Sequence, residues 1–228
     1  MKEPRSTDQP AGQPLPSIHH PAMLNAVYQP EKLLYRRGYT HIAGVDEVGR
    51  GPLAGPVVAA AVVLPPHHDF PGVDDSKKLT ASQREMAYAD IVSRALAVGI
   101  GIIDHNQIDL TNILKASLKA MAQAVAQLTC PVDFILVDGI YPIPSATTQL
   151  PLKGGDSRSL PIAAASVIAK VTRDRIMDGY HQHYPCYNFA SNKGYGTREH
   201  LDALRKYGHC PLHRKTFRGV KETHPGPF

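Results

Sequence analysis

From about residue 39 onward, short continuous apolar runs alternate with longer segments of mixed polarity. The apolar runs end at turn residues, which is typical of buried strands, and they predict strands at Ile42–Val45, Pro56–Leu64, Val98–Ile103 and Phe134–Val137. The mixed segments predict helices at Thr80–Ala97, from Ile162 to about Tyr180, and at Arg198–Tyr207. Strands that alternate with helices are typical of an α/β fold with a mixed sheet.

The clearest amphipathic helix precedes the last predicted strand. Its apolar residues recur at alternating spacings of four and three, and they are Leu114, Leu118, Met121, Val125 and Leu128. For the helix at Thr80–Ala97, either Thr80 or Ser82 is expected to serve as the N-cap.

Residues 1–35 have a different composition. They contain six prolines and show no helical or strand periodicity, which predicts a flexible Pro-rich tail, with at most a short helix around Met23–Tyr28. Residues 36–228 are expected to form one domain, because no internal repeat or second composition shift interrupts them.

Composition limits the class of protein. The longest apolar run, Val57–Leu64, is far shorter than the ~18 to 20 residues that a membrane span requires. The first thirty residues lack the pattern of a secretory signal. Three cysteines are an odd count without a close pair, so we expect no disulfide framework and a reducing, cytoplasmic location.

Charge is unevenly distributed along the chain. Residues 153–228 hold 13 Lys and Arg against six Asp and Glu, whereas residues 1–152 hold 12 against 14. A basic C-terminal third beside a mildly acidic body is typical of a protein that binds a polyanion on one flank. A solvated basic surface explains the charge alone equally well.

Four acidic residues stand where a strand ends or a turn begins. Asp46 and Glu47 follow the first predicted strand, Asp138 follows Phe134–Val137, and Asp156 follows a glycine pair ahead of a helix. The carboxyl ends of strands are where sites form in α/β sheets. Carboxylates gathered there repel one another unless a cation neutralises them. Taken singly, each acid is more simply explained as a cap of a helix or turn.

Oxygen ligands of this kind favour Mg²⁺ or Mn²⁺ and suit phosphodiester hydrolysis by two ions roughly 3.5 to 4 Å apart. The His and Cys residues of the C-terminal third lack the spacing of a zinc module. The chain also lacks a phosphate-binding GxxxxGK[ST] loop, a GxSxG elbow and a complete dinucleotide fingerprint.

Several other residues are candidates for binding a nucleic acid, and each has an ordinary structural alternative. The turn Gly49-Arg50-Gly51 allows close approach of backbone amides, and Tyr195 stands in a glycine-rich basic loop that could stack on a sugar or base. Phosphate contacts are expected from Lys77, Ser166 and Lys170, although Lys170 and Asp174, four apart on one helix face, more simply form an ion pair.

In order and spacing, these motifs resemble the type 2 ribonucleases H, specifically bacterial ribonuclease HII. The resemblance runs from about residue 39 to 220 and rests on residues 44–56, 75–79, 137–139, 155–157, 162–174 and 193–197. It implies a ribonuclease-H-like mixed central sheet flanked by helices, with a helical C-terminal extension. It also implies an endonuclease with Mn²⁺ or Mg²⁺, two ions when substrate is bound. The oligomeric state is left open by the sequence, in which nothing suggests more than a monomer.

The implied substrates are RNA–DNA hybrids, cut in the RNA strand, and duplex DNA with single embedded ribonucleotides. Incision on the 5′ side of the ribonucleotide would leave 3′-hydroxyl and 5′-phosphate ends. The resemblance makes Asp46 and Asp138 the principal metal ligands, with Glu47 in the same shell and Asp156 at the second ion.

The resemblance also assigns the binding residues. Gly49, Arg50 and Gly51 would read the ribose 2′-hydroxyl, and Tyr195 would pack on the following deoxyribose and reject a second hydroxyl there. Ser166 and Lys170 match positions expected to hold backbone phosphate, whereas for Lys77 phosphate contact and plain solvation explain the loop equally well.

Two features depart from the family pattern. Lys153-Gly154-Gly155-Asp156 stands where Lys-Gly-Asp is expected, which displaces Lys153, and the Pro-rich tail has no counterpart. We expect the tail to be dispensable for cleavage.

Two competing functions remain open at this point. One is a carboxylate–metal nuclease or phosphatase without ribonucleotide specificity. The other is a nucleic-acid-binding module without catalysis, which the four acids disfavour because negative charge facing phosphate weakens binding.

Overall fold

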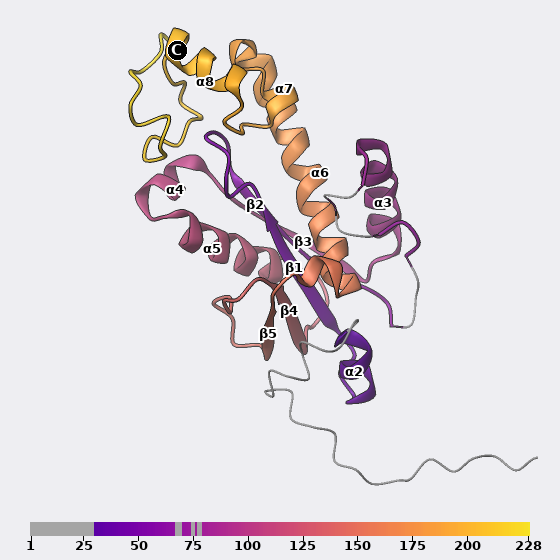
Figure 1. The fold of residues 1–228 in the computed structure, drawn as a ribbon. Helices are drawn as coiled ribbons and strands as arrows, with labels where there is room; N and C mark the ends of the chain where they lie inside the picture. Colours follow the sequence, from indigo (N-terminus) through magenta and orange to yellow (C-terminus); the bar gives the residue numbers. More distant parts are fainter. Residues whose placement is uncertain (1–29, 67–69, 74–75, 77–78) are drawn as a thin grey trace, which may run out of the picture.

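The computed structural model describes residues 30–66, 70–73, 76 and 79–228 of the chain (Figure 1). Its strands are β1 (Ile42–Val48), β2 (Val57–Val63), β3 (Ala97–Ile103), β4 (Phe134–Asp138) and β5 (Gln149–Leu152). Its α-helices are α2 (Pro30–Arg36), α3 (Ala81–Arg94), α4 (His105–Leu110), α5 (Ile113–Ala126), α6 (Leu160–His183), α7 (Phe189–Asn192) and α8 (Arg198–Tyr207). Two short 3₁₀ turns are η1 (Gly155–Ser157) and η2 (Pro185–Tyr187).

The five strands form one mixed sheet in the order β3-β2-β1-β4-β5. Strand β1 is central, antiparallel to β2 and parallel to β4, and β4 is in turn parallel to β5. The predicted α/β class, with a mixed central sheet and helices on its faces, is confirmed.

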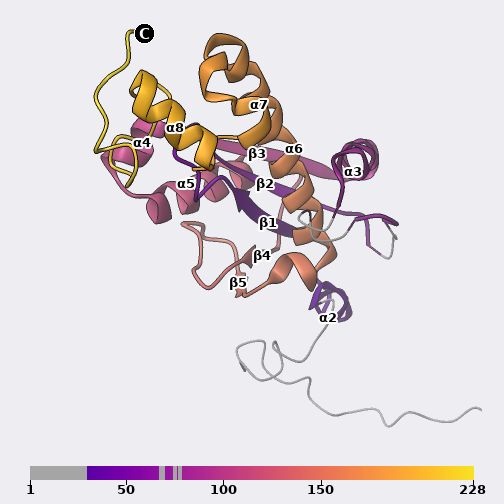
Figure 2. The same ribbon diagram turned by 45° about the horizontal axis from the view of Figure 1, so that its top comes forward.

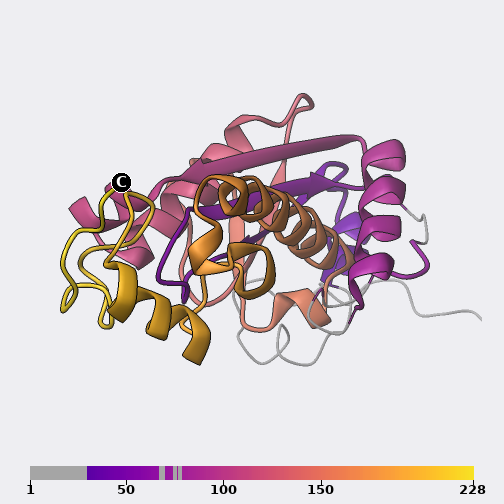
Figure 3. The ribbon, with the colours of Figure 1, turned by 90° about the horizontal axis from the view of Figure 1, so that it is seen from above.

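Alternate residues along the strands build two separate cores, one on each face of the sheet. On one face Ala59 and Ala61 of β2 pack with the apolar side of α5, and on the other Ala60 and Val62 pack with α6 and α3. Seen from above, α6 and α3 lie on the same side of the sheet (Figure 3). The near-continuous apolar run of β2 is explained by this burial on both faces.

The helices approach the sheet closely because small residues stand at the contacts. A Cβ at Gly44 in β1 would lie 2.1 Å from the backbone carbon of Pro161, at the start of α6. In β3, a Cβ at Gly99 or Gly101 would lie 2.0 Å from a carbonyl oxygen of α5. These three glycines therefore serve helix–sheet packing, and Gly99 and Gly101 need no nucleotide-binding role.

Helix α6 extends beyond the sheet and joins it to a C-terminal unit of α7, α8 and the chain to Phe228 (Figure 2). The helical extension implied by the resemblance is thus present. Its core contains Tyr187, Phe189 and Cys210, together with two fully buried histidines, His200 and His213.

Most predicted elements are observed with small shifts. Helix α8 has the predicted bounds, and α3 is capped by Thr80 in a capping box with Gln83. Strand β1 continues to Val48, three residues beyond the prediction, so Asp46 and Glu47 lie within the strand and do not follow it. Helix α4, strand β5 and helix α7 were not predicted, because each is short and lacks a repeated apolar pattern.

The end of the predicted tail is ordered. Residues 30–35 belong to helix α2, where Leu34 is buried and a carboxylate oxygen of Glu31 accepts a hydrogen bond from the Leu160 amide at 3.1 Å. This bond satisfies an amide at the start of α6, whose own N-cap residue, Ser159, makes no side-chain cap. The short helix expected around Met23–Tyr28 lies outside the described residues.

No helix in the described ranges is long and apolar enough to span a membrane.

Replacing Gly44 by Ala tests the contact between β1 and α6. The added methyl group would meet backbone atoms that cannot rotate away, so we expect a loss of about 3 kcal/mol or more in the free energy of unfolding, measured by urea denaturation. Gly179→Ala is the control, because its Cβ would meet nothing within 4 Å and helix propensity favours Ala. Equal stability of the two variants would contradict the close approach.

Acid should destabilise the C-terminal unit through His213. Burial lowers the pKa of His213 to about 3, so it stays neutral in the folded state while the unfolded chain takes up a proton below pH 6.5. Between pH 7 and 5.5 we expect wild type to lose about 1 kcal/mol more stability than His213→Gln, which cannot titrate. Parallel stability curves for the two proteins would show that His213 does not contribute.

Candidate active site

Three of the four predicted acids lie close together near the C-terminal ends of the neighbouring strands β1 and β4. Strands β1 and β4 are parallel neighbours in which Val45 pairs with Val137, so the next residues, Asp46 and Asp138, lie side by side at the same level. Glu47 follows Asp46 in β1, close enough for its charge and that of Asp138 to act on Asp46. The structure therefore brings these three acids together.

The site is electrostatically strained in the absence of a cation. Asp46 is 6% exposed, and burial, followed by the charges of Asp138 and Glu47, raises its pKa well above the ordinary range. Burial likewise raises the pKa of Glu47 to about 7, against the opposing effect of Arg50. Groups that resist ionisation because they face one another are stabilised when a cation binds between them.

Hydrogen bonds orient the side chains of these acids. Asp46 Oδ1 accepts from the Glu47 amide at 2.7 Å, and Glu47 Oε1 lies 3.2 Å from Arg50 Nη1. Glu47 Oε2 is buried, and no hydrogen-bond partner for it exists among the described residues. Asp138 Oδ1 accepts from the Gly155 amide at 2.7 Å.

As placed, no three His, Cys, Asp or Glu side chains of the described residues converge on one point as a ready-made metal site. The donor set still fits a hard divalent cation, because it consists of carboxylate oxygens and includes one orphaned, buried oxygen.

Asp156 reaches the same region through the glycine pair. Gly154 has a φ of 64°, which turns the chain into η1, and Gly155 packs so tightly that a Cβ there would lie 2.5 Å from Ile162 Cδ1. Asp156 is buried directly after these residues, between β4 and α6. The additional glycine is accommodated in the turn, and Lys153 before it is exposed.

A cavity of about 190 Å³ opens beside the acids. Glu47, Arg50 and Asp138 line one side, and Ile140 and Tyr141, both exposed, line another. The remaining wall comes from α5 and consists of Leu114, Ser117, Leu118 and Met121.

Sequence reasoning did not single out Ser117, Ile140 or Tyr141. Ser117 Oγ is buried without a hydrogen-bond partner among the described residues. Its signal was a hydroxyl on the otherwise apolar face of α5, whereas Ile140 and Tyr141 stand in a loop and show no pattern.

The predicted ribose-reading turn and the predicted tyrosine are neighbours. A Cβ at Gly51 would lie 3.7 Å from Tyr195 Cε1, and the Leu53 amide donates to the Gly194 carbonyl at 2.8 Å. The Tyr195 side chain is 42% exposed, so its ring can contact a ligand. Two segments about 145 residues apart in the sequence thus form one surface next to the acids.

The predicted phosphate ligands stand differently. Ser166 is buried, where it hydrogen-bonds Ser76 at 2.8 Å and the Asp46 carboxylate, so in this arrangement it supports an acid. Lys170 forms an ion pair with Asp174 at 2.7 Å, the simpler of the two readings of that pair. Lys77 lies outside the described residues.

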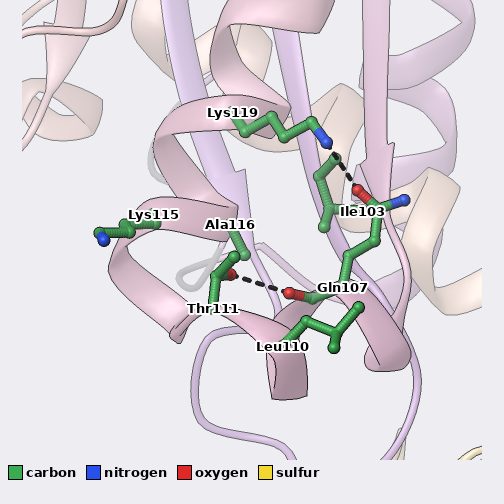
Figure 4. Close-up of a pocket in the computed structure, with 7 residues that line it drawn as sticks. All are labelled: Ile103, Gln107, Leu110, Thr111, Lys115, Ala116 and Lys119. Carbon is green, nitrogen blue, oxygen red and sulfur yellow. Dashed lines mark hydrogen bonds between the residues drawn. The ribbon is translucent and has the colours of Figure 1, made fainter.

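A second cavity, of about 260 Å³, lies where β3, α4 and α5 meet (Figure 4). Two hydrogen bonds join residues of its lining, from Lys119 Nζ to Gln107 Oε1 at 2.7 Å and from Thr111 Oγ1 to the Gln107 carbonyl at 2.8 Å. Its lining contains no acid and none of the predicted site residues, so it is not a candidate active site.

The mixed sheet in the order β3-β2-β1-β4-β5, with acids at the ends of β1 and β4, defines a ribonuclease-H-type nuclease. The ribonuclease H2 of Pyrococcus horikoshii OT3 has a TM-score of 0.67 at 27% identity, over 80% of this chain and 96% of that one. Bst ribonuclease HIII, solved in complex with Mn²⁺, shares the fold with a TM-score of 0.61 at 18% identity, over 80% and 68%.

The ribonuclease HII family model matches residues 43–220. Ribonuclease HII of Geobacter metallireducens is 58% identical over 84% of this chain and 90% of the relative, and that of Geobacter sulfurreducens is 57% identical over 86% and 91%. The chain belongs to the ribonuclease HII family, whose members are metal-dependent endoribonucleases.

Replacing Asp138 by Asn tests the cation site through stability. Asn keeps the acceptor for the Gly155 amide and removes one of the repelling charges, so at pH 8 the metal-free variant should melt a few °C higher, at about 2–4 °C per kcal/mol. Mn²⁺ should raise the melting temperature of wild type and not that of Asp138→Asn. Asp90→Asn is the control, because it removes a carboxylate from a half-buried ion pair on α3. An undiminished effect of Mn²⁺ on the melting temperature of Asp138→Asn would contradict the cation site.

Proposed function

We propose that this chain hydrolyses the RNA strand of RNA–DNA hybrids and incises duplex DNA on the 5′ side of single embedded ribonucleotides, leaving 3′-hydroxyl and 5′-phosphate ends. The observation that supports this most is the pairing of Val45 with Val137, which places acids of two parallel strands, one of them buried, side by side in a chain of the ribonuclease HII family. An arrangement that keeps negative charges together is difficult to explain unless cations and a phosphodiester occupy the site.

In this proposal Asp46 and Asp138 hold Mg²⁺ or Mn²⁺, Glu47 adds an oxygen to the same ion, and Asp156 serves a second one. The raised pKa values of Asp46 and Glu47 and the orphaned Glu47 oxygen support this assignment. When bound, the ions supply Lewis-acid stabilisation of the charge that develops on phosphate oxygens. The protein's part is to hold the carboxylates rigidly on two central strands.

Selection of ribonucleotides is assigned to the turn Gly49–Gly51 and to Tyr195. Backbone amides of the turn approach the 2′-hydroxyl, and the tyrosine ring packs on the next sugar, where a second hydroxyl would clash. The adjacency of Gly51 and Tyr195 supports a shared reading surface for the two sugars of one junction.

The basic C-terminal third supplies phosphate contacts and makes binding salt-dependent. Lys77, Ser166 and Lys170 are retained as phosphate-side residues, of which Ser166 acts through Asp46 in the observed arrangement. A monomeric state and a cytoplasmic location remain predictions, and the three free cysteines agree with a reducing compartment.

An end-labelled DNA duplex with one ribonucleotide tests the proposal. With Mg²⁺ or Mn²⁺ we expect a single incision 5′ of the ribonucleotide, none with chelator, and none in an all-DNA duplex. Asp46→Asn should lower turnover about 1,000-fold or more while substrate binding persists, because loss of the cation removes several kcal/mol of transition-state stabilisation.

The other outcomes identify the competing functions. Cleavage of both duplexes would indicate a nuclease without ribonucleotide specificity. Tight binding without cleavage under any metal condition would indicate a binding module.

A further inference from the structure

Two arginines, Arg173 in α6 and Arg214 near the C-terminus, are fully buried. Buried arginines usually pair with carboxylates, yet within the described ranges neither of these forms an ion pair. Among the described residues, their hydrogen bonds go to backbone carbonyl oxygens. Burial lowers the pKa of Arg173 to about 10 and that of Arg214 to about 9. Both guanidinium groups therefore remain charged at neutral pH.

Arg214 binds the carbonyls of the predicted ribose-reading turn. Its Nη2 donates to Gly49 O at 2.6 Å, its Nη1 donates to Arg50 O at 3.0 Å, and its Nε and Nη2 donate to Gly55 O at 3.1 and 3.0 Å. A rigid fork of donors can hold several carbonyls at once, which an ammonium group cannot do in a fixed geometry.

These bonds determine where the amides of the turn point. In a trans peptide the carbonyl and the following amide point in opposite directions, and no peptide in the described chain is cis. Since the carbonyls of Gly49 and Arg50 face the buried guanidinium, the amides of Arg50 and Gly51 face away from it. Within the described residues neither amide donates a hydrogen bond, so both are available to a ligand oxygen.

Arg173 connects the same segment to the tyrosine loop. It donates to Ala54 O at 3.1 Å and Pro56 O at 2.9 Å, beyond the turn, and to Lys193 O at 2.9 Å, two residues before Tyr195. From the core, the two arginines therefore hold both the turn Gly49–Gly51 and the loop that carries Tyr195.

A chain of imidazoles reaches Tyr195 from the residue next to Arg214. His200 Nδ1 lies 2.9 Å from the Tyr195 carbonyl, His200 Nε2 lies 3.0 Å from His213 Nε2, and His213 Nδ1 lies 3.0 Å from the Cys210 amide. The Tyr195 carbonyl only accepts, so His200 is protonated at Nδ1 and its Nε2 accepts from His213 Nε2–H. His213 Nδ1 then accepts from the Cys210 amide at 3.0 Å, with the Cys210 sulfur and carbonyl oxygen farther away, at 3.2 and 3.3 Å. Every bond in the chain is then satisfied with both rings neutral.

We propose that Arg214, His213 and His200 are positioning residues that hold the turn Gly49–Gly51 and Tyr195 in one register, and thereby determine how strictly the enzyme cuts at a ribonucleotide–deoxyribonucleotide junction. The inference rests on the proposed function, which assigns sugar recognition to the turn and to Tyr195. Discrimination by one hydroxyl group requires the turn and the tyrosine ring to be held within about 0.5 Å of the productive geometry. Two short loops need support from the core to achieve this.

The test uses a duplex whose labelled strand carries a short run of ribonucleotides followed by DNA. Wild type should cut mainly 5′ of the last ribonucleotide, at the junction. His200→Phe keeps the ring volume and loses both hydrogen bonds, so the ratio of junction cuts to cuts within the run should fall about tenfold. A role in general stability alone would lower all cuts together and leave this ratio unchanged.

Conservative variants separate positioning from folding. The amide of His200→Asn places a donor near the former Nδ1 and should restore most of the junction ratio, whereas that of His200→Gln reaches toward the Nε2 position and should not. Arg214→Lys keeps the charge without the fork and should lower the ratio. Arg94→Lys, at a half-buried ion pair on α3 away from both reading segments, should leave it unchanged.

Melting temperatures establish that each variant is folded. ¹⁵N NMR of the wild-type imidazoles provides a readout independent of activity, with His200 as the Nδ1–H tautomer and His213 as the Nε2–H tautomer. Other tautomers, or folded His200→Gln and Arg214→Lys variants with the wild-type junction ratio, would overturn the inference. Wild type that cuts without regard to the junction would contradict the proposed function itself, before any variant is compared.

Discussion

The parallel pairing of β1 with β4 at the centre of the sheet is the constraint on which the site depends. It places Asp46 beside Asp138, where burial and the charges of Asp138 and Glu47 raise the pKa of Asp46. That cost is tolerated because the strands cannot move apart, since α6 packs on one face through Gly44 and α5 packs on the other through Gly99 and Gly101. A cation relieves the repulsion, so the same arrangement that costs stability in the free protein creates affinity for a divalent ion.

A second principle concerns recognition by the main chain. Backbone amides can serve a ligand only if the carbonyls of the same segment are satisfied elsewhere, and buried carbonyls are costly without donors. Arg173 and Arg214 supply those donors from within the core, at the expense of burying two positive charges. The charges also stand beneath a surface that is proposed to meet a polyanion, where they favour its approach.

In the proposed function the C-terminal unit is consequently part of the site and not an appendage that only adds charge. Ala54 forms a β-bridge with His213, and the Arg214 amide donates to the Leu53 carbonyl at 2.8 Å. The turn after β1 is thus held between the sheet and the C-terminal unit, and Tyr195 is delivered by the latter. Correct folding of residues 185–220 is required for the geometry of a loop more than 130 residues earlier.

The sequence by itself determined the features that depend on local pattern. Apolar runs and helical periodicity located the principal strands and helices, the Thr80 cap was visible in its own segment, and the motifs around Asp46, Asp138, Asp156 and Tyr195 were sufficient to indicate the family. Only the tertiary structure decided what depends on distant partners. Strand β5 exists because β4 offers it an edge, and α2 is ordered because Glu31 and Leu34 contact α6 and the sheet core. The targets of Arg214 and the tautomers of the His200–His213 pair likewise follow from long-range contacts, because a side chain's partner is set by where the folded chain places it and its type alone does not specify that partner.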